Sequence, residues 1–218
     1  MRALIVGISG VMGRVMQRLA GQNDFYIVAG CDSKTGISAL RQVDCDVVIE
    51  FAAPGATHDT LVYAVKNRIP AVIATTGHSQ SRTEEIYAAA KEIPVFFDSN
   101  FSLGAAALAA AAKRVKKLLP SGDVAIVETQ RAGKKDAPGG TAKKLKAFLG
   151  NDADIFSVRL GDERGRHDVI FSMPDQTLVL THKALSREAF ARGAITAARY
   201  VLDKGAGLYT MENILYDA

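Results

Sequence analysis

The sequence predicts an α/β fold in which a doubly wound parallel sheet is followed by a smaller α+β domain with an open mixed sheet. Two observations predict this class. Up to about residue 100, apolar strand-like runs alternate with amphipathic helical stretches, which is the pattern of parallel strands connected by crossover helices. Beyond that point the alternation stops, and a long Ala-rich helix precedes several consecutive strand-like runs.

The first part of the chain is expected to form the parallel sheet. Its strands are predicted at residues 3–6, 26–31, 47–51, 71–74 and 95–97, and its helices at residues 11–20, 57–66 and 81–91. The runs Val47-Val48-Ile49 and Val95-Phe96-Phe97 are continuously apolar and do not alternate with polar residues. Strands of this kind are buried on both faces, so helices are expected on each side of the sheet.

The second part begins with a helix predicted at about residues 103–118. It continues with a strand at 124–128, a helix from Thr141, and strand-like runs at 156–160, 167–172 and 178–182. The last two runs are joined by the turn Met173-Pro174-Asp175-Gln176, which predicts a hairpin within an open sheet. Ser186 is expected to cap a helix running to about residue 202, and Gly205-Ala206-Gly207 to introduce a short closing segment.

Composition is typical of a globular protein with one large or two small domains. Of its 218 residues, 48% are hydrophobic and 7% aromatic, and no apolar run reaches the ~18 residues that span a bilayer. The chain starts with a strand and a glycine turn in place of a charged leader. We expect a cytoplasmic protein in which Cys31 and Cys45 are reduced; a disulfide or a nucleophilic role is the alternative.

The formal net charge of +4 does not indicate nucleic-acid binding. The basic residues are dispersed along predicted helix faces, for example at Lys113, Arg114, Lys116 and Lys117, without interleaved aromatic residues. The positive excess instead favours small anionic ligands, such as a phosphate-bearing cofactor and an acidic substrate. No cluster of His, Cys or carboxylate residues has the spacing of a metal site.

A glycine turn follows the first predicted strand. Gly7, Gly10 and Gly13 have the spacing G-x-x-G-x-x-G, a variant of the fingerprint whose glycines allow a tight turn, close approach of a pyrophosphate, and helix–strand packing. Asp32 comes roughly twenty residues later at the end of the second predicted strand, where a carboxylate accepts hydrogen bonds from ribose hydroxyls. Together these features predict a dinucleotide site; alone, the glycines also fit a purely structural turn.

The residues around Asp32 bear on the choice of cofactor. Asp32 favours NADH, because a carboxylate repels a 2′-phosphate, whereas Ser33 and Lys34 can hold that phosphate. We therefore expect NADH, NADPH or both. Phe51 and Thr75-Thr76-Gly77 follow two further strands at the carboxyl edge of the sheet, where ligands of such folds bind; a plain strand-to-helix loop is the alternative for the latter.

A basic loop precedes the helix predicted from Thr141. It contains Arg131, Lys134 and Lys135, and it ends in Gly140 and Thr141 at the helix start. Backbone N–H groups at a helix start have no intrahelical partner and lie at the positive end of the helix dipole, so they bind anions. With the three cations, the loop is predicted to hold a small dicarboxylate.

Six motifs, in order along essentially the whole chain, resemble the dihydrodipicolinate reductase family. They are Gly7-x-x-Gly10-x-Met12-Gly13, Val48-Ile49-Glu50-Phe51, Thr75-Thr76-Gly77, Asn100-Phe101-Ser102-Leu103-Gly104, Lys134-x-Asp136-Ala137-Pro138-x-Gly140-Thr141-Ala142 and Thr181-His182-x-Ala184-x-Ser186-Arg187-x-x-Phe190-Ala191-x-Gly193-Ala194. The resemblance implies a Rossmann-like cofactor domain at residues 1–101 and 187–218. It also implies a mixed-sheet domain at 102–186 that binds substrate and forms a homotetramer.

The resemblance implies a reaction and a set of site residues. The reaction is reduction of 4-hydroxy-tetrahydrodipicolinate to tetrahydrodipicolinate by NADH or NADPH, in lysine and diaminopimelate biosynthesis. The predicted cofactor-binding residues are Gly7, Gly10, Val11, Met12, Gly13, Asp32, Ser33, Lys34, Phe51, Thr75, Thr76, Gly77, Asn100 and Phe101. The predicted substrate-binding residues are Arg131, Lys134, Gly140 and Thr141.

The chain departs from the family at the predicted catalytic positions. The family signature is usually Glu-x-His-His-Arg-x-Lys-x-Asp-Ala-Pro-Ser-Gly-Thr, but Gln130 and Arg131 replace the two histidines and Gly139 replaces the serine. Gln130 donates a hydrogen bond but no proton near neutral pH, so a general-acid contribution of about 10²- to 10⁴-fold is expected to be missing or supplied elsewhere. Arg131 can bind a carboxylate bidentately. Lys134, which binds a carboxylate or assists proton transfer, and Gln130 are the predicted catalytic residues.

The four histidines offer little compensation for this loss. His78 follows the Thr-Thr-Gly loop and is a candidate substitute acid, although a solvated side chain is the favoured interpretation. His167 and His182 are expected to orient strands and turns, and His58 to belong to a helix start.

Two further functions stay open at this point. One is a diverged reductase for another acidic cyclic imine, and the other is a catalytically silent nucleotide- or dicarboxylate-binding protein. A semialdehyde-type dehydrogenase is excluded, because the second domain lacks a nucleophilic cysteine.

Overall fold

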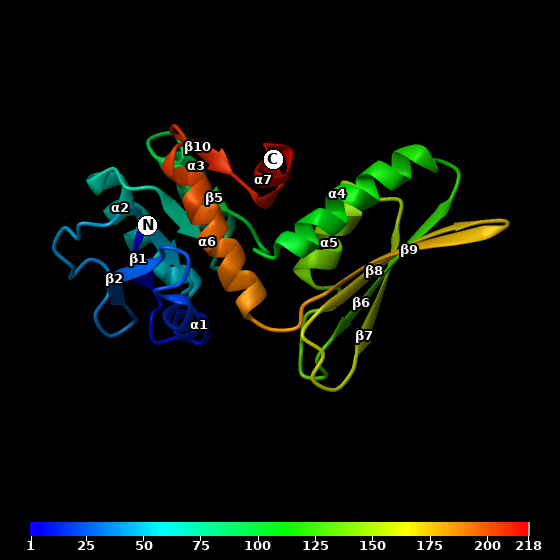
Figure 1. Cartoon of the computed structure of the whole chain (residues 1–218), viewed down its shortest axis with the longest axis horizontal. Coiled ribbons are helices and arrows are strands. Elements are labelled where there is room, and N and C mark those ends of the chain that lie inside the picture. Colours follow the sequence, from blue (N-terminus) through cyan, green and yellow to red (C-terminus); the bar gives the residue numbers. More distant parts are fainter. Residues whose placement is uncertain (218) are drawn as a thin grey trace. The chain divides into compact units, whose positions relative to one another are not determined.

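The computed structural model describes residues 1–217, which divide into two compact units. One unit contains Met1–Phe101 and the described residues from Phe190 onward, and the other contains Ser102–Ala189. The first unit holds a six-stranded sheet and the second a four-stranded sheet (Figure 1). The predicted α/β class is therefore confirmed. No helix in the described part of the chain is both long and apolar enough to cross a membrane.

The six-stranded sheet is parallel throughout, with the strand order β10-β5-β4-β3-β1-β2. Its strands are β1 (Arg2–Val6), β2 (Tyr26–Cys31), β3 (Val47–Glu50), β4 (Ala71–Ile73), β5 (Pro94–Phe97) and β10 (Gly207–Tyr209). The accompanying helices are α1 (Val11–Leu19), the short 3-10 helix η1 (Pro54–Ala56), α2 (Thr57–Asn67), α3 (Gln80–Ala89), α6 (Glu188–Leu202) and α7 (Met211–Tyr216). The first two residues of α6 belong to the second unit.

Burial follows the position of each strand in the sheet. Every residue of β3 and β4 is fully buried, as expected for central strands covered on both faces. The edge strand β2 instead leaves Tyr26 and Val28 exposed. The closing segment, expected only as a short stretch after Gly205-Ala206-Gly207, supplies the sixth strand, because residues from Gly207 to Tyr209 pair in parallel with β5.

The four-stranded sheet is mixed, with the order β7-β6-β8-β9. The elements of this unit are α4 (Leu103–Leu118), β6 (Asp123–Gln130), α5 (Gly140–Phe148), β7 (Asp154–Arg159), β8 (Arg166–Met173) and β9 (Gln176–Lys183). Strand β6 runs parallel to β7 and antiparallel to β8, and β8 and β9 form the predicted hairpin. The crossover helix α5 connects the parallel pair, as such a pair requires.

Helices cover one face of this sheet. Helix α4 packs against β9 and helix α5 against β6 and β7, and both helices lie on the same side of the strands in Figure 1. The shared core includes Leu108 and Leu145 from the helices and Ile126, Val169 and Phe171 from the strands. The opposite face carries exposed apolar side chains, among them Phe156, Val158 and Val179.

Candidate active site

The glycine turn between β1 and α1 has no room for larger residues. Gly7 has a φ of +88°, and a Cβ there would lie 2.2 Å from the carbonyl oxygen of Phe51. A Cβ at Gly13 would lie 2.3 Å from the carbonyl oxygen of Gly7. Gly10 is the N-cap of α1, and because glycine has no side chain, the backbone N–H groups at the helix start are not capped by it. This geometry fits a phosphate group bound against the backbone.

The residues after β2 are arranged around Asp32. Its Oδ1 accepts hydrogen bonds from the N–H groups of Lys34 at 2.9 Å and Thr35 at 3.4 Å. The Lys34 backbone bond, followed by a bond from Ser9, lowers the pKa of Asp32 below its ordinary value. Ser33 and Lys34 are exposed beside this carboxylate. A negative charge is therefore held at the predicted ribose position, with a cation next to it.

Two further predicted cofactor segments meet at the carboxyl ends of neighbouring strands. Strands β3 and β4 are parallel and paired, so Phe51 and Thr75-Thr76-Gly77 follow at the same edge of the sheet. The Thr75 hydroxyl links the two loops, because its Oγ1 lies 3.0 Å from the Ala52 N–H and 3.2 Å from the Ala52 carbonyl. Thr76 and Gly77 remain exposed.

Asn100 and Phe101 follow β5 at the end of the first segment of this unit. The Phe101 side chain is buried and contacts the rings of Phe51 and Phe96, with centroid distances of 6.5 Å and 5.6 Å. Its carbonyl oxygen closely approaches helix α6, where a Cβ at Gly193 would come within 1.6 Å. The Phe101 side chain therefore belongs to the core, and its carbonyl packs against α6.

The basic loop connects β6 to α5. Gln130 is the last residue of β6, and the exposed Arg131 begins the loop. The Lys134 N–H donates to the Arg131 carbonyl at 3.1 Å, which forms a turn, and the Lys134 ammonium pairs with Asp136. This ion pair lowers the pKa of Asp136. Two of the predicted carboxylate-binding cations thus lie on one short turn.

Helix α5 begins where the sequence places the anion site. Its N-cap is Gly139, which makes no side-chain cap hydrogen bond, and a Cβ at Gly140 would meet open space. Thr141 follows in the first turn and is partly exposed. The loop and helix start therefore bring Arg131, Lys134, Gly140 and Thr141 into one continuous segment.

A buried carboxylate that the sequence did not single out holds this segment. Glu128 is fully buried, and its Oε1 accepts hydrogen bonds from the Gly139 N–H at 2.9 Å, Ser157 Oγ at 2.8 Å and Arg159 Nη2 at 2.8 Å. Burial raises the pKa of Glu128, but the hydrogen bonds from Arg159, Ser157 and Gly139 outweigh burial and hold the pKa below its ordinary value. Glu128 is thus a charged anchor for the start of α5.

Arg159 connects Glu128 to the backbone of the basic loop. Its Nη2 also donates to the Asp136 carbonyl at 2.6 Å, and its Nε donates to the Lys134 carbonyl at 3.4 Å. The Glu128–Arg159 pair therefore binds the backbone of the loop at Lys134, Asp136 and Gly139. This pairing depends on the register of β6 with β7, which the local sequence does not reveal.

A polar row crosses the same face of the sheet. The register aligns Ser157, Glu128, His167 and His182 on the four strands in turn. His167 is buried, and its Nε2 lies 3.9 Å from Glu128 Oε2. At the other end, His182 Nε2 lies 3.1 Å from the Oγ of Ser102, the N-cap of α4. The bond to the N-cap of α4 fits the expectation that His182 orients a turn, whereas neither ring nitrogen of His167 has a hydrogen-bond partner in the described structure.

The structure contradicts the favoured interpretation of His78. A solvated loop histidine was expected, but His78 is partly buried and its Nε2 lies 2.9 Å from Thr57 Oγ1. The ring also contacts Phe97 edge-on, with a centroid distance of 5.5 Å. The interpretation is wrong because it took account only of the loop and not of the start of α2 packed against it.

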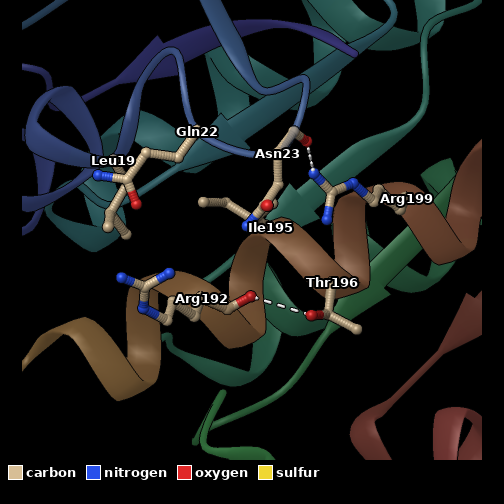
Figure 2. Close-up of a pocket in the computed structure, with 7 residues that line it drawn as sticks. All are labelled: Leu19, Gln22, Asn23, Arg192, Ile195, Thr196 and Arg199. Atoms are coloured by element: carbon tan, nitrogen blue, oxygen red, sulfur yellow. Dashed lines mark hydrogen bonds between the residues drawn. The ribbon is translucent and has the colours of Figure 1, made fainter.

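A pocket of about 150 Å³ lies apart from the predicted site residues. Figure 2 shows its lining, which comes from the end of α1, the following loop and one side of α6. Two arginines line it, Arg192 and Arg199, and Arg199 donates to the Asn23 carbonyl. The pocket is at the opposite end of α1 from the glycine turn. Among the described residues, no group of three or more His, Cys, Asp or Glu can hold a metal ion.

Comparison with known proteins decides the family. The model described as "Dihydrodipicolinate reductase, N-terminus" matches residues 1–101, and the model described as "Dihydrodipicolinate reductase, C-terminus" matches residues 104–215. The chain belongs to the dihydrodipicolinate reductase family. The resemblance recognised from the six motifs is therefore confirmed.

Relatives match this dihydrodipicolinate reductase family member along its whole length. The 4-hydroxy-tetrahydrodipicolinate reductase of Caldanaerobacter subterraneus subsp. tengcongensis is 38% identical over 98% of both chains. That of Akkermansia muciniphila is 36% identical, over 97% of this chain and 96% of the relative. A dipicolinate-bound dihydrodipicolinate reductase from Paenisporosarcina sp. TG-14 shares the fold, with a TM-score of 0.82, 22% identity and 98% coverage of both chains.

One stability prediction arises from the polar row of this family member. Burial lowers the pKa of His167 from 6.5 to about 4, so the folded protein binds a proton there less readily than the unfolded chain does. The free energy of unfolding is expected to fall by about 3 kcal/mol as the pH drops from 6.5 to 4. Urea unfolding at several pH values measures this loss.

The variant His167→Leu should show a smaller loss over the same pH interval, because it cannot titrate. The matched control is His58→Leu, since His58 is exposed and pairs only with Glu85 among the described residues. An identical pH dependence in His167→Leu and the unsubstituted protein would contradict the assignment.

Proposed function

We propose that the protein reduces 4-hydroxy-tetrahydrodipicolinate to tetrahydrodipicolinate with NADH or NADPH, in the cytoplasmic pathway to lysine and diaminopimelate. The observation that carries the proposal is that both halves of the chain match the family and each contains its own predicted ligand site. The unit with the glycine turn is assigned to the dinucleotide, with predicted bounds 1–101 and 187–218. The unit with the basic loop, predicted at 102–186, is assigned to the substrate.

The dinucleotide supplies the hydride, and the chain positions it. The open start of α1 accepts the pyrophosphate, and the Asp32 carboxylate accepts hydrogen bonds from the adenosine ribose. The charge on Asp32 favours NADH, while the exposed Lys34 side chain offers a partner for the 2′-phosphate of NADPH. At the carboxyl edge of the sheet, the nicotinamide end of the dinucleotide contacts Phe51 and Thr75-Thr76-Gly77.

The basic loop fixes the two carboxylates of the substrate. Lys134 and the N–H groups of Gly140 and Thr141 bind one carboxylate at the start of α5, and the Arg131 guanidinium binds the other. The Glu128–Arg159 pair keeps the loop backbone in place, so that less ordering is needed when substrate binds. Hydride transfer depends mainly on such positioning.

The proton follows a different route from that of the family. Gln130 occupies the family's acid position at the end of β6 and supplies only a hydrogen bond. Reduction of the 4-hydroxy compound adds one hydride and one proton, and the hydroxyl group leaves as water. Lys134 and Lys135 on the loop can both release that proton, directly or through a bound water, and Lys134 Nζ lies beside the start of α5, 3.4 Å from where a Cβ at Gly139 would be. We therefore assign proton delivery to Lys134 and substrate orientation to Gln130.

Gln130 is also the observation that favours a second candidate function. Loss of the acid fits a diverged reductase for another acidic cyclic imine, or a silent homologue that binds nucleotide and dicarboxylate without turnover. The test is oxidation of NADH and NADPH with freshly generated 4-hydroxy-tetrahydrodipicolinate, beside the double variant Gln130→His, Arg131→His. Turnover by the unsubstituted protein supports the proposal, whereas turnover only by the double variant supports divergence or silence.

The open sheet face supports assembly into a homotetramer. Phe156, Val158 and Val179 are 55%, 41% and 48% exposed, and α4 and α5 do not cover their face of the sheet. An apolar surface of this kind is typical of a subunit interface. Val179→Lys is expected to lower the mass measured by light scattering after size-exclusion chromatography from that of a tetramer to a smaller species.

The matched control is Asp175→Lys, in the turn at the tip of the same hairpin, which is expected to remain tetrameric. A monomeric unsubstituted protein, or an unchanged tetramer in Val179→Lys, would contradict this interface.

A further inference from the structure

A second buried carboxylate lies at the carboxyl end of β3, next to the residues that are predicted to bind the cofactor. Glu50 is the last residue of β3, and it is fully buried. Its Oε1 accepts a hydrogen bond from Thr57 Oγ1 at 2.7 Å, and its Oε2 is a buried oxygen without a hydrogen-bond partner in the described structure. The next residue, Phe51, contacts the glycine turn through its carbonyl, because Gly7 lies directly against it. Glu50 is therefore close to the backbone that is predicted to bind the dinucleotide.

Thr57 links this carboxylate to His78. Thr57 is fully buried at the first residue of α2, and its Oγ1 lies 2.7 Å from Glu50 Oε1 and 2.9 Å from His78 Nε2. A hydroxyl has one proton, and a carboxylate can only accept. Thr57 therefore donates to Glu50 and accepts from His78, which assigns the proton of the neutral imidazole to Nε2.

The bond to Thr57 fastens one end of the predicted nicotinamide loop. His78 follows Gly77 directly, and Thr75 fastens the other end through its hydroxyl bonds to Ala52. Between these two anchors, Thr76 and Gly77 are exposed and Gly77 has a φ of +83°. Burial lowers the pKa of His78, so the imidazole is neutral and adds no charge to the loop near neutral pH.

We propose that His78 is a positioning residue for the cofactor, which holds the Thr75–Gly77 loop against α2 through Thr57 and Glu50. This proposal rests on the proposed function, because the loop is assigned to the nicotinamide end of NADH or NADPH. The side chain acts through the loop, and its loss is expected to reduce dinucleotide binding without changing how the basic loop binds a dicarboxylate.

The test compares His78→Leu, which removes the donor, with His78→Gln, which keeps an N–H donor near the position of Nε2. In His78→Leu the Kd for NADH, measured by its fluorescence, and the KM for NADH are expected to rise about tenfold, because the buried Thr57 hydroxyl loses its donor and the loop loses its bond to α2. His78→Gln should stay within about threefold of the unsubstituted protein. The Kd for pyridine-2,6-dicarboxylate, measured with saturating NADH, should not change in either variant.

Two further variants keep the test decisive. Thr57→Val keeps the shape of the side chain and removes both hydrogen bonds, including the one to Glu50. The NADH Kd should therefore rise at least as much as in His78→Leu, even if the latter folds poorly. His58→Leu, one residue further along α2, should leave the NADH Kd unchanged because His58 is exposed and bonded to Glu85. Melting temperatures identify any loss that comes from unfolding.

The outcomes separate this proposal from the proposed function. An NADH Kd that stays the same in His78→Leu and Thr57→Val, or that rises equally in His78→Gln, overturns the role of His78. NADH binding by the unsubstituted protein without turnover overturns the proposed function, yet the Kd comparison still decides the role of His78. Binding of neither dinucleotide overturns both.

Discussion

Replacing Lys134 with alanine is expected to weaken dicarboxylate binding by about 100-fold, since charge-assisted hydrogen bonds to a bound anion each contribute roughly 1.5–3 kcal/mol. Lys134 lies on the turn that leads into α5, and its ammonium has only the exposed Asp136 as an ion-pair partner among the described residues. A substrate carboxylate can therefore replace Asp136 at little cost. Calorimetric titration of pyridine-2,6-dicarboxylate into the NADH-saturated protein measures the change.

Lys143→Ala is the matched control for Lys134, because Lys143 is an exposed cation near the start of α5. It is expected to change the Kd by less than about twofold, as an exposed charge is screened by solvent. An unchanged Kd in Lys134→Ala, or an equal loss in both variants, would refute the role assigned to Lys134.

The second large effect is expected at Glu128. Glu128→Ala removes three hydrogen bonds, leaves the Gly139 N–H without its acceptor and leaves the Arg159 guanidinium without its carboxylate partner, bonded to backbone carbonyls. Breaking a buried ion pair in this way typically costs about 3–5 kcal/mol, and the lower end is expected because Arg159 is partly exposed. Urea unfolding measures the loss, and dicarboxylate titration of the folded fraction should show weaker binding because the loop is no longer anchored.

Glu163→Ala serves as the comparison for Glu128. Glu163 pairs with Lys183 at 2.8 Å in the same unit, but Lys183 is exposed and Glu163 is only partly buried, whereas Glu128 is fully buried. The Glu163–Lys183 pair should therefore contribute less than about 1 kcal/mol. If the two alanine variants lost equal stability, Glu128 would not be the anchor of the basic loop.

Much of the fold was predictable because its signals are local. The predicted helix at residues 103–118 matches α4, since a Ser N-cap and a periodic Ala-rich face define it within its own sequence. The strand predicted at 124–128 extends to Gln130, because pairing with Arg159 of β7 continues beyond the apolar run. Strand β10 was not predicted as a strand, since three residues carry little signal and its pairing with β5 spans the chain.

The candidate site likewise contains parts that the local sequence predicts and parts that depend on contacts between distant segments. The glycine turn and the basic loop are continuous in sequence, so their residue types alone indicate a nucleotide and an anion. Glu128 and Arg159 meet only through strand register, and His78 meets Thr57 only through packing of α2 against the loop. An acidic residue on the apolar face of the predicted strand, two positions after Ile126, was the one local sign of the anchor.

We expect this one chain to catalyse hydride transfer from a nicotinamide to a cyclic dicarboxylate. The most direct measurement uses NADH deuterated at the transferable C4 position, with 4-hydroxy-tetrahydrodipicolinate, and determines the mass of the product. The predicted result is tetrahydrodipicolinate carrying one deuterium, formed in step with NADH oxidation and lost in Lys134→Ala. Product without deuterium, or no product from folded protein that binds both ligands, would contradict the claim.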